Sequence, residues 1–88
     1  MNFYPNSRRQ FTKIILKKFP NAKITEDMNK LPEYLLWMLE EIEKMDGSRK
    51  ATRWLGYVIG RIETLELCNN SKPRDIVRID VKNEDNRN

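Results

Sequence analysis

The residue pattern between Ser48 and Cys68 constrains the fold of this chain more than any other stretch. Apolar residues recur there every three or four positions, which is the spacing of one side of an α-helix. On a helical wheel with about 100° per residue, this stripe consists of Ala51, Trp54, Leu55, Val58, Ile59, Ile62 and Leu65. The segment is therefore predicted to be an amphipathic helix whose apolar face packs against other helices.

The opposite face of this helix contains two glycines, Gly56 and Gly60, about one turn apart. Each costs about 1 kcal/mol relative to alanine inside a helix. Their neighbours on this face are Arg49, Arg53, Tyr57 and Arg61. Three interpretations stay open: a self-association face on which small residues let another backbone come close, a ligand or nucleic-acid face on which Tyr57 stacks, or glycines that are merely tolerated.

A second helix is predicted at about 32–45, directly before the first. Aromatic side chains widen its apolar stripe, which predicts burial on more than one side. The stripe consists of Leu35, Met38, Leu39, Ile42 and Met45. Gly47 suits the position after the end of this helix, and Ser48 suits the cap of the next one. Because the connection is so short, the two helices are expected to form an antiparallel hairpin in which Trp37 meets Trp54.

A basic amphipathic helix is predicted at 8–19, where Asn6 or Ser7 can cap its start and Pro20 ends it. Its apolar stripe consists of Phe11, Ile14, Ile15 and Phe19. Its other face is cationic and includes Arg8, Arg9, Lys13 and Lys17. Two interpretations stay open. The stripe docks on the protein's own core and the cations only solubilise the helix, or the cations also bind nucleic acid, an anionic membrane or an acidic partner helix.

Charge is distributed unevenly along the chain, whose net charge is +4. Residues 1–23 carry six cationic side chains and no acid, whereas residues 24–46 carry seven acids and two lysines. Glu40, Glu41 and Glu43 crowd the end of the predicted helix 32–45, where the helix dipole disfavours anions. We therefore expect the basic helix, from the same chain or from another copy, to lie nearby and to offset that cost.

The segment 75–82 is ambiguous. Its apolar residues alternate with charged ones, as in a strand, but Ser71 shortly before it equally indicates the start of a helix. A single strand would have no partner strand in this chain, so we favour a short helix. Residues 1–82 are expected to form one helical domain, and residues 83–88 a disordered tail.

The composition argues against an enzyme. The chain has no histidine, the commonest general base and metal ligand, and no glycine-rich phosphate loop or calcium loop. Cys68 is the single cysteine, so no cysteine-based zinc site is possible, and its thiol is expected to pack in the core or at a helix end. No cofactor is expected. No apolar run reaches the length of a signal peptide or a membrane span, so we expect a cytoplasmic protein without membrane contact.

Two stretches carry a resemblance: Leu36-Trp37-Met38-Leu39 and Lys50-Ala51-Thr52-Arg53-Trp54-Leu55-Gly56-Tyr57-Val58. Over residues 35–67 the chain resembles small, uncharacterised proteins that are common in bacteriophages and prophages. This resemblance implies a helical hairpin and no assigned reaction. The chain is also loosely similar to phage sponge proteins that sequester cyclic-nucleotide defence signals. Because only Arg53-Trp54 and the hairpin layout are shared with those oligomeric proteins, that similarity implies no site residues.

Together these features predict an all-α fold, with a basic N-terminal amphipathic helix packed on an antiparallel helical hairpin and a short C-terminal element. So short a chain buries little core alone, so we expect a homodimer or higher oligomer. The preferred function is a non-catalytic, phage-type accessory protein that acts stoichiometrically on a host factor through an anionic ligand: RNA, DNA or a nucleotide. The alternative is a protein-interaction module or inhibitor that binds an acidic host protein as a homo-oligomer, with Gly56 and Gly60 in the seam.

Overall fold

The fold is all-helical, as the sequence predicts. The computed structural model describes residues 3–65 and 72–85, and within these ranges it contains no strand. The four helices are α1 (Pro5–Lys18), α2 (Glu33–Lys44), α3 (Ser48–Thr64) and α4 (Lys72–Asp85). No helix in the described part of the chain is both long enough and apolar enough to cross a membrane.

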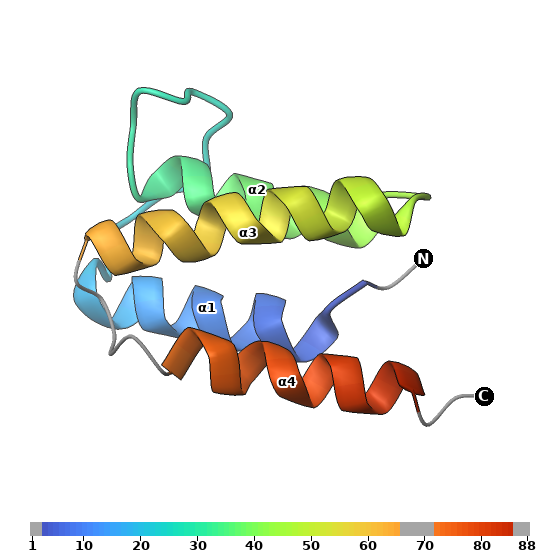
Figure 1. The fold of residues 1–88 in the computed structure, drawn as a ribbon. Helices are drawn as coiled ribbons and strands as arrows, with labels where there is room; N and C mark the ends of the chain where they lie inside the picture. Colours follow the sequence, from blue (N-terminus) through green and yellow to red (C-terminus); the bar gives the residue numbers. More distant parts are fainter. Residues whose placement is uncertain (1–2, 66–71, 86–88) are drawn as a thin grey trace.

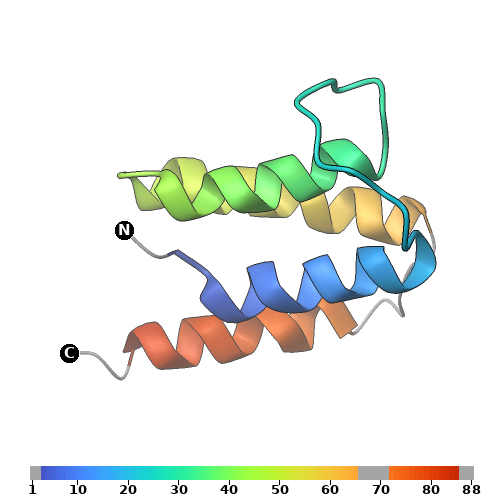
Figure 2. The same ribbon diagram turned by 180° about the vertical axis from the view of Figure 1, so that it is seen from behind.

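The helices pack as a chain of neighbours, in which α3 lies on α2, α2 on α1, and α1 on α4. Helices α3 and α4 face the viewer in Figure 1. Helices α1 and α2 lie behind them and face the viewer in Figure 2, which shows the molecule from the other side. The α2–α3 pair is the predicted antiparallel hairpin. The rings of Trp37 and Trp54 meet across it with their centroids 5.7 Å apart, as expected.

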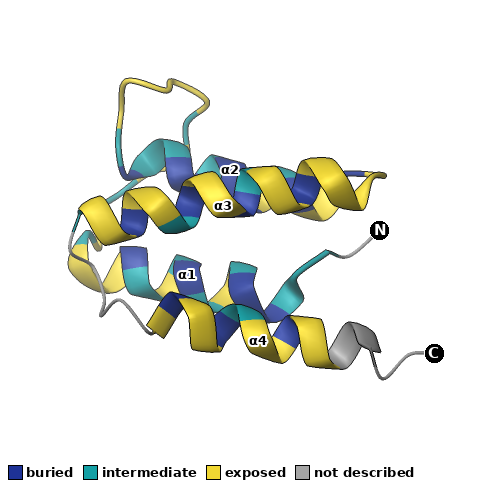
Figure 3. Cartoon of the chain, viewed as in Figure 1, coloured by how far each residue is buried: buried dark blue, intermediate teal, exposed yellow. Residues whose placement is uncertain are grey.

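The core lies between these helices and is built from their apolar stripes. On α3 the side chains of Ala51, Leu55, Val58 and Ile62 are buried. On α1 the side chains of Phe11 and Ile15 are fully buried. The stripe of the basic helix therefore docks on the protein's own core, which leaves the exposed faces of the helices, coloured yellow in Figure 3, to any partner.

The start of α1 differs from the prediction, because neither Asn6 nor Ser7 caps it. Both lie inside the first turn and are buried. The N-cap residue is Tyr4, which adopts a left-handed conformation (φ 52°, ψ 52°) and makes no side-chain cap hydrogen bond. The first N–H groups of α1 therefore need an acceptor from elsewhere, since they have none within the helix.

Asp80 of α4 supplies that acceptor. The backbone N–H of Asn6 donates to Asp80 Oδ1 at 2.9 Å, and that of Ser7 donates to Asp80 Oδ2 at 2.6 Å. The Ser7 hydroxyl donates to the same oxygen. The carboxylate is 5% exposed and sits at the positive end of the α1 dipole, where an anion is stabilised. One buried side chain thus caps a helix that lies more than seventy residues away in sequence.

The C-terminal element is a helix, which confirms the favoured prediction. The alternation in its sequence results from two helical faces, because Pro73, Ile76 and Asp80 are buried whereas Ile79 and Val81 are exposed. The helix continues to Asp85, three residues into the segment expected to be a tail. Residues 86–88 and Cys68 lie outside the described residues.

The junction between α2 and α3 also differs in detail from the prediction. Gly47, and not Ser48, is the N-cap of α3, with an extended backbone (φ −129°, ψ 128°). Ser48 is the first helical residue, and the cap makes no side-chain hydrogen bond. Glycine is an acceptable N-cap residue. Helix α3 therefore begins at Ser48, one residue earlier than it would with Ser48 as its N-cap.

We expect Asp80→Ala to lower the free energy of unfolding by about 2–4 kcal/mol, because it leaves two buried N–H groups and a hydroxyl without their acceptor. Urea denaturation followed by circular dichroism measures this loss. The matched control is Asp75→Ala, which removes an exposed carboxylate from the first turn of the same helix and costs less than about 1 kcal/mol. Equal losses in the two variants would show that the Asp80 contacts do not matter.

Candidate binding surfaces on α3 and α4

The predicted ligand residues of α3 share one exposed face, here called the outer face of α3. The structure places on it Arg49, Arg53, Gly56, Tyr57, Gly60 and Arg61. The Arg61 Nε–H donates to the Tyr57 hydroxyl oxygen at 3.1 Å, and the Arg61 guanidinium carbon lies 5.3 Å from the centroid of the Tyr57 ring. The ring, which is 39% exposed, is thereby paired with a cation at the surface.

Both glycines of this face border open space. A Cβ atom added at Gly56 or at Gly60 would have no heavy atom within 4 Å, the helix's own backbone aside. Neither glycine is therefore needed for packing inside the chain, as their place on the helical wheel predicts. The choice between a self-association face, a ligand face and mere tolerance stays open.

The cations of α1 have a different environment. Arg8 pairs with Glu43 of α2 at 3.2 Å, and its Nε–H donates to the Phe3 carbonyl oxygen at 2.9 Å. Arg9 and Lys13 line a surface depression of about 340 Å³ between α1 and α2, whose wall also includes Glu40 and Glu43. The expectation that the basic helix lies beside the acidic end of α2 is confirmed within one chain. The cations of α1 therefore have carboxylates close to them.

The structure does not bring the two predicted sets of cations together. Helix α1, with its exposed Arg9, Lys13 and Lys17, packs against α2 and α4, whereas α3 packs against α2. In Figures 1 and 2, α1 and α3 accordingly belong to opposite sides of the molecule. The outer face of α3 and the cationic face of α1 are therefore separate candidate surfaces.

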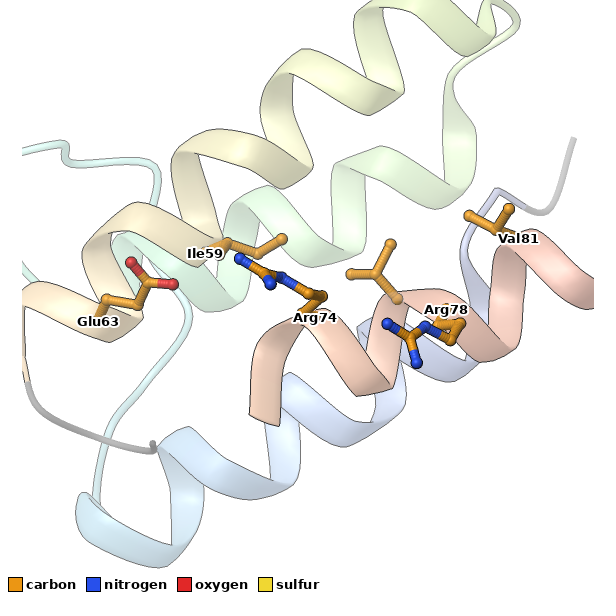
Figure 4. A pocket seen from close by; sticks show the side chains of 6 residues that line it. Ile59, Glu63, Arg74, Arg78 and Val81 are labelled. Atoms are coloured by element: carbon orange, nitrogen blue, oxygen red, sulfur yellow. The ribbon is translucent and has the colours of Figure 1, made fainter. Parts of the chain in front are cut away.

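Sequence reasoning missed a third feature, a groove of about 510 Å³ between α3 and α4, here called the α3/α4 groove. Its lining, shown in Figure 4, consists of Ile59, Glu63, Arg74, Val77, Arg78 and Val81. Arg74 and Arg78 stand four residues apart, as do Val77 and Val81. That spacing puts each pair on one helical face. The sequence indicates such a face only if 72–85 is already known to be a helix.

Among the described residues, no three His, Cys, Asp or Glu side chains gather closely enough to hold a metal ion. The surface offers exposed arginine, one exposed tyrosine ring and an apolar groove. Such groups can contact a partner through charge, stacking and burial of apolar surface.

The chain matches no family model, no curated protein and no solved structure. The resemblance to phage proteins therefore stays a prediction, and function has to be inferred from the surfaces themselves.

We expect Gly60→Ala to raise the free energy of unfolding by about 0.5–1 kcal/mol, because the added methyl group meets open space and alanine favours the helix. The opposite sign is expected for Gly47→Ala, since alanine is a poorer N-cap than glycine. Thermal unfolding of both variants tests this pair. A destabilised Gly60→Ala protein would mean that the glycine face is packed against a second copy in solution.

Proposed function

We propose that this protein is a non-catalytic binding protein that acts stoichiometrically and holds the phosphate backbone of a nucleic acid on the outer face of α3. One observation carries the proposal. Arg49, Arg53 and Arg61 are exposed on a single helical face, and no ion pair joins any of them to an acidic residue in the described part of the chain.

The chemistry of this face suits a nucleic acid. Arginine presents a planar fork of donors that matches the oxygens of a phosphate group. From Arg49 to Arg61 the row extends over roughly 18 Å of helix, and a DNA duplex carries about one charge per 1.7 Å of axis. Several phosphates would therefore lie within reach. The exposed ring of Tyr57, already paired with Arg61, provides a surface on which a base can stack.

The biological setting is also proposed and rests on the sequence resemblance. A phage-type accessory role would have the protein occupy a host nucleic acid instead of transforming it. A homo-oligomer with Gly56 and Gly60 in its seam is the competing use of the same face of α3. An acidic host protein is the second candidate partner, and the observation that favours it is the pair Arg74 and Arg78 beside the apolar walls of the α3/α4 groove.

We expect the affinity for a fluorescently labelled RNA or DNA oligonucleotide, measured by anisotropy, to fall steeply with salt concentration. The double variant Arg53→Ala/Arg61→Ala should bind more weakly. The slope of log affinity against log salt concentration should also become less negative, by about 0.7–0.9 for each phosphate contact that is lost. Unchanged helicity by circular dichroism would show that the fold is retained, because both side chains are exposed.

The matched control for this experiment is Lys23→Ala/Lys30→Ala, which removes the same charge from exposed positions in the connector between α1 and α2. We expect it to bind nearly as well as the unaltered protein. If the two double variants weaken binding equally, the interaction depends on net charge alone and the outer face of α3 is not the site. If the unaltered protein binds neither oligonucleotide, the proposed function is wrong.

A further inference from the structure

The α3/α4 edge is the open side of the helix arrangement. Close packing joins α3 to α2, α2 to α1 and α1 to α4, whereas the groove of about 510 Å³ separates α3 from α4. The two helices run antiparallel beside it (Figure 1). A recess between two helices is a shape that accepts a third helix.

The walls of the groove leave apolar side chains in water. Ile59 and Val77 are only half-buried, and Val81 is 45% exposed. Apolar surface of this kind is stabilised when a ligand removes it from water, so an occupant with an apolar stripe fits these walls.

The charges along the groove indicate which charged side chains flank the apolar stripe of the occupant. The α4 wall carries Arg74 and Arg78, both exposed and one turn apart, and the α3 wall carries Glu63. Figure 4 shows the Arg74 side chain extending from α4 toward the α3 side of the groove. Neither arginine has an ion pair among the described residues. Their spacing matches acidic residues at positions i and i+4 of a helix.

We propose that the α3/α4 groove binds one amphipathic α-helix of another protein, with its apolar stripe on Ile59, Val77 and Val81 and its acidic flank on Arg74 and Arg78. A basic residue on the opposite flank of that helix pairs with Glu63. Arginine and apolar side chains together are typical of protein–protein contact surfaces, and the charges set the orientation of the bound helix.

A second copy of this chain does not supply such a helix. The acidic helix α2 buries its own stripe, including Leu35, Leu39 and Ile42. The stripes of α1 and α3 are likewise buried. The exposed side of α4 carries Lys72, Asp75 and Lys82 beside Ile79, so its net charge is positive where the groove calls for acid. The occupant is therefore a different protein.

This site is independent of the nucleic-acid site proposed above. Ile59 and Glu63 lie on the flank of α3 that faces α4, about 80° or more around the helix from Arg53 and Arg61, and Arg49 lies more than two turns before Ile59. Loss of one activity therefore leaves the other in place, and the two proposals can fail separately.

The test uses two synthetic peptides of about 18 residues, long enough to form a helix, with the same leucine stripe. One carries Glu along one flank and the other carries Lys at those positions. Each is titrated into the isotopically labelled full chain by NMR. We expect the Glu peptide to shift the amide signals of Ile59, Val77 and Val81, and to bind about tenfold more tightly than the Lys peptide.

Reversing the charge of the two groove arginines gives the most discriminating variant of this test. In Arg74→Glu/Arg78→Glu the preference should invert in favour of the Lys peptide. The matched control Arg49→Glu/Arg53→Glu makes the same charge change on the outer face of α3 and should keep the preference for Glu. Val81→Asp should weaken the Glu peptide about tenfold or more by placing a charge on the apolar wall.

Several results would overturn the proposal. Binding of neither peptide, equal binding of both, or shifts confined to other surfaces would each do so. So would a preference that inverts equally in the control variant. A dimer that sediments as such and is dissociated by Val81→Asp would replace the partner helix with self-association. Displacement of the Glu peptide by an oligonucleotide would reassign the groove to nucleic acid.

Discussion

The arrangement of the helices depends on the contact between the Asp80 carboxylate and the first turn of α1. A buried carboxylate is costly unless it is hydrogen-bonded, and buried N–H groups at a helix start are costly unless they find an acceptor. Here each satisfies the other, because Asp80 accepts from the backbone of Asn6 and Ser7. The Asn6 side chain adds a bond to the Ile76 carbonyl oxygen at 3.0 Å. A shift of either helix that keeps these groups buried breaks their hydrogen bonds without letting water replace them.

This contact also fixes the register of α4 along α1. A slip by one turn moves Asp80 about 5.4 Å, out of reach of the α1 backbone. Apolar packing tolerates such shifts far better, because its energy has no direction. The fixed register sets where Val77 and Val81 stand opposite Ile59, so the shape of the α3/α4 groove depends on a polar contact on the other face of α4.

Pairing inside the chain decides which charges stay available. The acids of α2 lie beside the cations of α1, where Glu43 pairs with Arg8. No comparable pairing reaches the arginines on the outer face of α3 or along the groove within the described residues. A chain with a modest net charge of +4 thus presents two arginine-bearing surfaces on one side of the molecule. One carries an exposed ring, and the other is apolar and recessed, which is why we assign them different partners.

The sequence by itself determined helices α1 to α3, their apolar stripes, the hairpin, the meeting of Trp37 with Trp54 and the exposure of Gly56 and Gly60. All of these follow from a periodicity of three to four residues or from a short connection, so they depend only on residues that are close together in the sequence. Only the tertiary structure decided that Asp80 caps α1 and that Arg74 and Arg78 border a groove. The partners of Asp80 lie 73 and 74 positions away, and nothing in its neighbourhood distinguishes it from a surface acid. Local patterns show which face a residue occupies, and packing decides what that face meets.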